Sequence, residues 1–230
     1  MVPSGLSIIV PVLNEARQIV WRLRALAALR AAGAELIVVD GGSSDDTVML
    51  ATTHCDHVIA APLGRAAQMN AGAAHARGAA LLFLHADTRL PADADRLIVS
   101  ALATHPWGRF DVRLTGAHPM MPVIATAMNW RSRLSGIATG DQAMFVRRSV
   151  FEQLGGFAAL PLMEDIELSR RLLRVGRPAC LAARVISSGR RWRQHGVWRT
   201  IWLMWRLRLA YFFGADPHRL ARAYGYRPVP

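Results

Sequence analysis

Two side chains that could bind a cation stand at the end of an apolar segment. His85 and Asp87 follow the run "LLFL" at residues 81–84, and Pro91 ends the stretch after them. A carboxylate in this position either closes a turn or coordinates a metal such as Mg²⁺ or Mn²⁺. A second acid, Asp40, ends another apolar run, "ELIVVD". The local sequence leaves both interpretations open.

The segments that must position these side chains alternate between two patterns. Short β-rich runs predict strands, and apolar residues three or four positions apart predict helices between them. This alternation is typical of an α/β fold with a mostly parallel sheet and helices on both faces. The predicted strands are 6–13, 35–40, 57–61 and 80–86; the predicted helices run from Asn14 to near Gly33, over 45–54 behind a Ser43–Asp46 capping box, and over 65–76.

The second half of the chain has a less regular pattern. Residues 109–116 and 141–151 predict strands, residues 163–176 predict a helix, and the segment after 196 is helical and rich in Trp and Arg. We expect one domain over 1–196 and a C-terminal helical extension over 197–230.

The composition excludes several classes of protein. With 52% hydrophobic and 19% charged residues among 230, the chain is not disordered. The two cysteines, Cys55 and Cys180, lack the spacing of a zinc site or a disulfide framework, which favours a reducing cytoplasm. A proline interrupts the first apolar run, so we expect no signal peptide, and no uncharged stretch is long enough for a conventional membrane-spanning helix.

The positive charge lies entirely in the second half. Residues 1–115 contain 10 arginines and 10 acids, whereas residues 116–230 contain 18 arginines and 6 acids, which accounts for the net charge of +12. This asymmetry indicates that the second half faces an anionic partner.

The carboxyl ends of the predicted strands are the expected ligand site, because open parallel sheets bind ligands there. Asp40 and Asp87 would share this edge, but neither a G-x-G-x-x-G loop nor a Walker A loop is present. A bound diphosphate would therefore have to be neutralised by a metal and by arginines.

A set of motifs, in order along the chain, resembles family 2 glycosyltransferases of the GT-A fold. The set covers about residues 6–196 and comprises "SIIVPVLNE", "ELIVVDGGSSDDT", "GRAAQMNAG", "FLHADTRL", "TGDQAMFVRRSVFEQLGGF", "MEDIELSRRL" and "RRWRQHG". Within the family the chain looks most like the small arsenosugar-biosynthesis, or radical-SAM/selenodomain-associated, transferases.

The resemblance implies a nucleotide and metal site in the first half. Asp87 matches the last acid of the D-x-D motif, which binds Mn²⁺ or Mg²⁺, while His85 stands where the first acid would be. A neutral imidazole favours Mn²⁺ over Mg²⁺. The other implied nucleotide-binding residues are Pro11, Asn14, Glu15, Asp40, Gly41, Ser43, Arg65 and Asn70.

The second half would supply the catalytic base and the acceptor site. The resemblance makes Asp165 the base, with Glu164 as second choice, although acids in the first turn of a helix also favour its N-terminal dipole. Gly140, Asp141 and Gln142 match a loop beneath the acceptor, and the alternative is a tight turn into a strand.

The "RRWRQHG" segment resembles a reduced form of a motif found in processive members. Arg191 would bind the leaving diphosphate and Trp192 would stack on an acceptor, but the leading Gln is missing, so processive polymerisation is not expected. His195 is a candidate third metal ligand, or a structural histidine.

The last predicted helix places aromatic side chains on one face between arginines. Trp198, Trp202 and Trp205 lie there with Ile201 and Leu209. Such a face suits an anionic membrane surface, here the inner face of the membrane, or it packs on the domain or on a second subunit in a homodimer. No nucleic-acid-binding module is present, so we expect no nucleic-acid partner.

The resemblance implies an inverting, metal-dependent transfer of a hexosyl-type sugar from a nucleotide-sugar donor, with UDP-sugars favoured because they are common in the family. The alternative is a non-catalytic nucleotide-sugar-binding or peripheral membrane scaffold protein of the same fold. Hydrolysis of a nucleotide sugar in the presence of metal would distinguish them.

Overall fold

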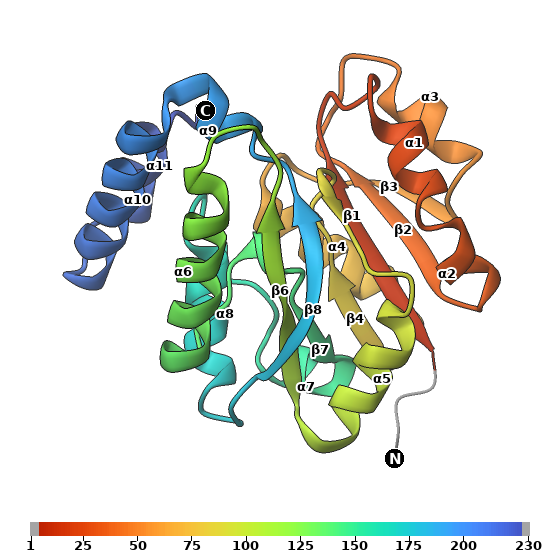
Figure 1. Ribbon diagram of the computed structural model, residues 1–230. Helices are drawn as coiled ribbons and strands as arrows, with labels where there is room; N and C mark the ends of the chain where they lie inside the picture. The colour runs from red at the N-terminus through yellow and green to blue at the C-terminus, as the bar shows by residue number, and fades with distance from the viewer. Residues whose placement is uncertain (1–4, 227–230) are drawn as a thin grey trace.

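One mixed sheet runs through the computed structural model, which describes residues 5–226 (Figure 1). The first half supplies four parallel strands, and β1 lies between β2 and β4. Val12 pairs with Asp40, so the carboxyl ends of β1 and β2 lie at the same edge. The four strands are β1 (Leu6–Val12), β2 (Glu35–Asp40), β3 (His57–Ala60) and β4 (Ala80–Phe83).

The second half extends this sheet with a change of direction. β7 is antiparallel to both β4 and β6, and β8 runs parallel to β6 with a register shift after Phe110. β5 pairs with β8 through Thr88 and Ser187, which brings the segment after Asp87 against the end of β8. The strands are β5 (Thr88–Arg89), β6 (Trp107–Leu114), β7 (Phe145–Arg147) and β8 (Ala179–Ser187).

Helices cover both faces of the sheet, as Figure 1 shows. The helices of the sheet domain are α1 (Ile19–Arg24), α2 (Ala27–Ala31), α3 (Thr47–Thr52), α4 (Arg65–His75), α5 (Ala94–Thr104), α6 (Met120–Ser135), α7 (Arg148–Gln153) and α8 (Glu164–Leu172). Three further helices, α9 (Arg190–His195), α10 (Val197–Phe212) and α11 (Pro217–Tyr224), follow β8 and lie at one edge of the molecule. In residues 5–226 no helix has both the length and the apolar character needed to span a membrane.

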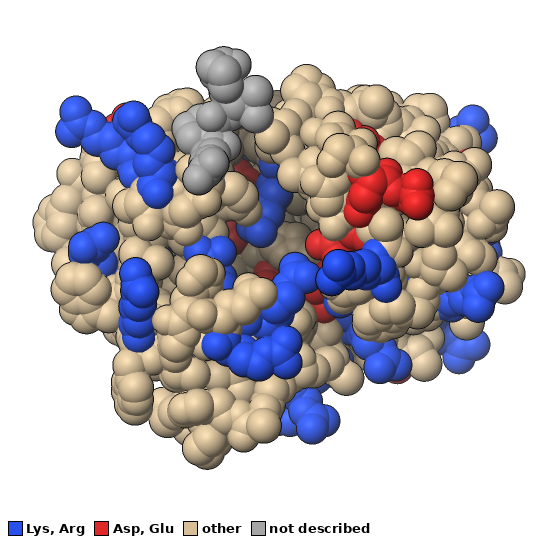
Figure 2. Space-filling view, turned by 90° about the horizontal axis from the view of Figure 1, so that it is seen from above, with Lys and Arg blue, Asp and Glu red and all other residues tan. Residues whose placement is uncertain are grey.

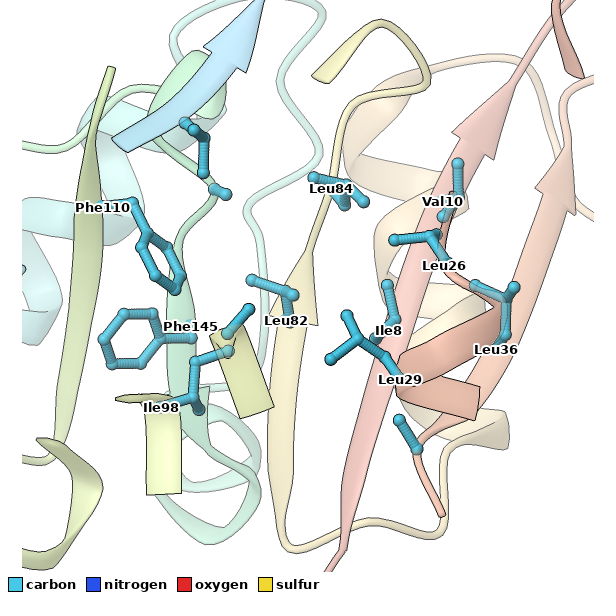
Figure 3. Packing of buried hydrophobic residues seen from close by; sticks show 14 of the residues in the cluster. Ile8, Val10, Leu26, Leu29, Leu36, Leu82, Leu84, Ile98, Phe110 and Phe145 are labelled. Carbon is cyan, nitrogen blue, oxygen red and sulfur yellow. The ribbon is translucent and has the colours of Figure 1, made fainter. Parts of the chain in front are cut away.

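The sheet has an apolar core on each face, and this explains why its strands are continuous apolar runs in the sequence. Alternate residues of a strand point to opposite faces, so Ile8 and Val10 belong to one core and Ile9 to the other. Both faces are covered, and the strands therefore carry no polar alternation. Figure 3 shows the first core, where the Leu82 side chain projects from β4 among other buried apolar residues. Burying a leucine of this kind contributes about 1.5–3 kcal/mol.

The predicted α/β fold is confirmed, but several local predictions were wrong. The helix after Asn14 is divided into α1 and α2. The Ser43–Asp46 capping box does not form, because the Ser43 hydroxyl donates to Asp40 instead. Residues 141–151 are not one strand: a 3₁₀ turn (Gly140–Gln142), β7 and α7 share this segment. Helices α5 and α6 were not predicted.

Candidate active site

A cleft of about 980 Å³ opens at the carboxyl edge of the sheet. Figure 2 looks into it and shows basic side chains around the hollow, with acidic side chains inside. Its walls come from the ends of β1 and β4, the start of α4, the 3₁₀ turn, the start of α8, and helices α9 to α11. The first half and the basic second half therefore meet across one cavity.

Three potential metal ligands converge in this cleft. His85, Asp87 and Asp141 place one ligand atom each so that all three atoms lie within 4.8 Å of one another. Ligands on opposite sides of a Mg²⁺ ion would be about 4.2 Å apart, so small side-chain shifts would close these three on one cation. The pair of carboxylates and an imidazole is also a donor set that suits Mn²⁺. The residues present therefore fit a divalent cation.

Asp141, and not His195, is the third potential ligand in this cluster. Its Oδ1 lies 3.7 Å from His85 Nδ1 and accepts a hydrogen bond of 3.3 Å from the Ser187 hydroxyl. Partial burial alone would raise the pKa of Asp141, but His85, Arg65 and Ser187 hold that pKa below its ordinary value. The carboxylate is therefore ionised and ready to bind a cation at neutral pH.

The imidazole at position 85 fits because residue 140 has no side chain. A Cβ atom built on Gly140 would lie 2.2 Å from both Cε1 and Nε2 of His85, far inside van der Waals contact. Any larger residue would force the ring to move. The lack of a side chain at Gly140 therefore leaves room for the His85 ring, a role that its motif did not suggest.

The candidate base is joined to the same turn. Asp165 Oδ2 accepts a hydrogen bond of 2.9 Å from the Gly140 backbone N–H. Asp165 remains half-buried and lines the cleft, whereas Glu164 is only 5% exposed. Burial, and then the charge of Asp165, raise the pKa of Glu164. Asp165 is thus the more accessible carboxylate of the pair.

Non-glycine residues with left-handed backbone conformations adjoin this cleft. Among the described residues they are Asn14, Ala143 and Met163, with φ of 52°, 48° and 70°. They follow β1, end the 3₁₀ turn and precede α8, respectively. Each such conformation costs about 1–3 kcal/mol and persists where surrounding structure enforces it, often at functional sites. The three loops that carry candidate site residues are therefore held in specific shapes.

Comparison with known sequences decides the family. The sequence profile described as glycosyl transferase family 2 matches residues 7–155. The chain belongs to this family. No curated protein matched the chain.

The family 2 chain also shares its fold with solved glycosyltransferases. The structure of S. aureus TarS 1-349 in complex with UDP-GlcNAc superposes with a TM-score of 0.67 at 17% identity, covering 80% of this chain and 58% of that one. Glucosyl-3-phosphoglycerate synthase from Mycobacterium tuberculosis, in complex with Mn²⁺, UDP and glucosyl-3-phosphoglycerate, gives 0.59 at 19% identity, covering 80% and 70%. The fold is the GT-A type. This chain spans about three-fifths of the length of the TarS 1-349 structures.

Several family-motif residues of the first half build a turn instead of lining the cleft. The Asp40 carboxylate accepts from the backbone N–H of Gly42 and Ser43 and from the Ser43 hydroxyl. Ser43 accepts in turn from the Asn14 N–H at 2.9 Å. A Cβ on Gly41 would approach the Gln68 side chain to 3.0 Å. These contacts give this turn its shape, and a contact with the nucleotide stays a prediction.

The remaining predicted residues divide between cleft and interior. Gln142 is fully buried and forms a capping box with Thr139, so it does not reach the cleft. The Asn70 side chain bonds both backbone groups of Phe157, at 2.8 and 2.9 Å, on the cleft side of α4. His195 is exposed at the cleft but does not belong to the three-ligand cluster. The other predicted residues that line the cleft are Pro11, Glu15, Arg65, Arg191 and Trp192.

Two tyrosines near the C-terminus were missed by sequence reasoning. The rings of Tyr224 and Tyr226 stack with centroids 5.4 Å apart at the cleft. The Arg191 guanidinium lies 3.5 Å from the Tyr224 centroid and donates to the Tyr224 carbonyl at 2.8 Å. The Arg65 guanidinium lies 5.6 Å from the Tyr226 centroid. A tyrosine ring thus lies against each of the two arginines expected near the nucleotide, Arg65 and Arg191. The only sequence signal for these contacts is the motif "YGY" at 224–226.

Proposed function

We propose that this protein transfers a sugar from a UDP-sugar to a nucleophilic acceptor with inversion at the anomeric carbon, and that it needs a divalent cation. The observation that carries the proposal is the shared cleft, where His85, Asp87 and Asp141 converge and Asp165 is bonded to the same turn. Family membership supports the reaction class. TarS and the M. tuberculosis synthase, which share the fold, bind UDP in their crystal structures and support uridine as the base.

The metal would be held by His85, Asp87 and Asp141. A divalent cation bound there would neutralise charge on the diphosphate leaving group. The nitrogen ligand makes Mn²⁺ the better fit than Mg²⁺, because imidazole suits transition metals. In our proposal Arg191 and Arg65, which both line the cleft, bind the diphosphate.

Asp165 is the proposed general base. It takes the proton of the acceptor hydroxyl as the acceptor oxygen forms its bond to the anomeric carbon. The bond between that carbon and the diphosphate oxygen breaks in the same step, and the electron pair leaves with UDP. The Gly140 N–H would keep the carboxylate aimed into the cleft. Glu164 is the second choice, because it is buried and its pKa is raised.

The finer assignments rest on sequence motifs. We propose that the chain is a member of the arsenosugar-biosynthesis, or radical-SAM/selenodomain-associated, subgroup and that it moves a hexosyl group. Gly140 and Trp192, which line the cleft, are proposed to contact the acceptor. The rival proposal is a non-catalytic nucleotide-sugar-binding protein, favoured by the loss of the first D-x-D acid at His85.

A thermal-shift and hydrolysis panel tests the proposal. UDP with Mn²⁺ should stabilise the protein by about 2.7 kcal/mol at a hundredfold excess over its Kd. UDP-glucose and UDP-GlcNAc should be hydrolysed slowly with Mn²⁺ and not with EDTA. Binding of UDP without any hydrolysis or transfer would support the non-catalytic rival, and no binding of any nucleoside diphosphate would reject both.

A further inference from the structure

Helix α10 exposes five large apolar side chains. Trp198, Trp202, Trp205, Leu209 and Phe212 are between 60% and 74% exposed. Successive members are four, three, four and three positions apart, so they form one line along the helix. We call these five residues the Trp stripe. A monomer in water gains nothing from exposing such a line.

The opposite face of α10 holds the helix on the domain. Thr200 and Leu207 are each 2% exposed, and Leu207 packs with Leu162, Ile166 and Leu220 in a small separate core. Figure 1 shows α10 beside α11 at the outer edge of the molecule. The Trp stripe therefore points away from the domain, and these five side chains are not core residues within this chain.

The surroundings of the Trp stripe are positive. At 100° per residue, Arg199 and Arg206 flank it on one side and Arg208 on the other. The Arg206 guanidinium lies 5.0 Å from the Trp202 ring centroid. Residues 190–213 contain six arginines and no acid. A second copy joined through this stripe would set arginines against arginines, whereas anionic lipid headgroups complement both flanks.

We propose that α10 lies in the headgroup region of an anionic membrane, with the Trp stripe immersed and the flanking arginines paired to lipid phosphates. Tryptophan favours this interface because its ring is apolar and its N–H is polar. With 16 residues, α10 would lie along the surface. Thr200, Met204 and Leu207 also line the cleft, so the wall of the cleft would rest on the membrane. This proposal does not depend on the proposed function.

Vesicle sedimentation of the full chain tests the proposal. The protein should sediment with vesicles of phosphatidylcholine mixed with phosphatidylglycerol, not with phosphatidylcholine alone, and added salt should release it. Trp202→Ala with Trp205→Ala should lower the bound fraction at least about tenfold. Trp21→Ala, which removes a tryptophan that is 45% exposed on α1, is the matched control and should bind as the parent does.

Measurements of melting temperature and of molecular mass in solution distinguish membrane binding through the Trp stripe from its packing within the chain or against a second copy. The double variant should keep the parent melting temperature, because the two removed rings are 65% and 74% exposed. Failure of the parent to bind anionic vesicles, or equal binding by the double variant, would overturn the proposal. So would a parent dimer in solution that the double variant converts to a monomer with a lower melting temperature.

Discussion

The two halves of the molecule build their shares of the cleft in different ways. Residues 5–115 place His85 and Asp87 just beyond the buried parallel strand β4, at the carboxyl edge of the sheet. Residues 116–226 supply Asp141 from a 3₁₀ turn, Asp165 from a helix start, and arginines and tyrosines from three terminal helices. The site residues of the first half follow one strand, whereas those of the second half come from several elements that must pack together.

Gly140 contacts site residues from both halves of the molecule. His85, from the first half, approaches Gly140 so closely that a Cβ would clash with its ring. The N–H of the same glycine donates to Asp165, from α8. A candidate metal ligand and the candidate base are therefore positioned through a single residue. Disturbing one half at this contact should disturb the other.

The largest effect is expected from the first half, at Asp87. Asp87→Asn should lower kcat/KM by about 10³–10⁴-fold, because a catalytic cation contributes several kcal/mol to the transition state. The Mn²⁺ dependence of UDP binding should disappear while the melting temperature of the free protein stays near the parent value. Steady-state kinetics and thermal shifts with and without EDTA measure both effects. Unchanged metal dependence would make Asp87 a turn residue only.

The second half is tested at Asp165 with two variants. Asp165→Asn should lower kcat by about 10²–10⁴-fold and leave UDP binding unchanged, because the amide oxygen can still accept from Gly140 but cannot take a proton. Asp165→Ala removes the acceptor as well and should also weaken Mn²⁺ binding at Asp141. If both variants bind Mn²⁺ and UDP equally well, the hydrogen bond between Gly140 and Asp165 does not affect metal binding.

The contact between the halves is tested at Gly140. Gly140→Ala should displace His85 and weaken Mn²⁺ binding by about 10–100-fold, the range seen when support of a metal ligand is lost. The double variant with His85→Ala should bind Mn²⁺ no worse than His85→Ala alone, since the clash is then gone. Isothermal titration with Mn²⁺ reports both values. Additive losses would show that Gly140 acts independently of His85.

The smallest effect is expected at the tyrosine cover. Tyr226→Ala should tighten UDP binding by about two- to fivefold, because an exposed cation–π contact is worth roughly 0.5–1 kcal/mol and the ring covers Arg65. Leu209→Ala, on the exposed face of α10, serves as a control for changes in the terminal helices. Weaker UDP binding by Tyr226→Ala would instead show that the ring contacts the nucleotide.

The sheet of the first half and the residues at its edge could be predicted from the sequence. Its strands are apolar on both faces, so their runs stand out, and β2 and β4 place Asp40 and Asp87 where a parallel sheet binds ligands. The sequence also revealed four members of the Trp stripe, because the spacing of apolar residues along a helix is a local property. Phe212 was not predicted there, and Ile201, expected on the same face, is partly buried against the first core. These features depend on neighbours in sequence, which a pattern can report.

The contacts between side chains from distant parts of the chain could not be predicted in this way. Asp141, about fifty residues from Asp87 in sequence, joins the candidate metal cluster because β5 pairs with β8 and Ser187 of β8 donates a hydrogen bond to Asp141. Two other features also arise from packing between distant segments. One is the close approach of His85 to Gly140, and the other is the contact of tyrosine rings with Arg65 and Arg191. Such contacts depend on how separate elements pack, and short-range periodicity carries no information about packing between distant segments.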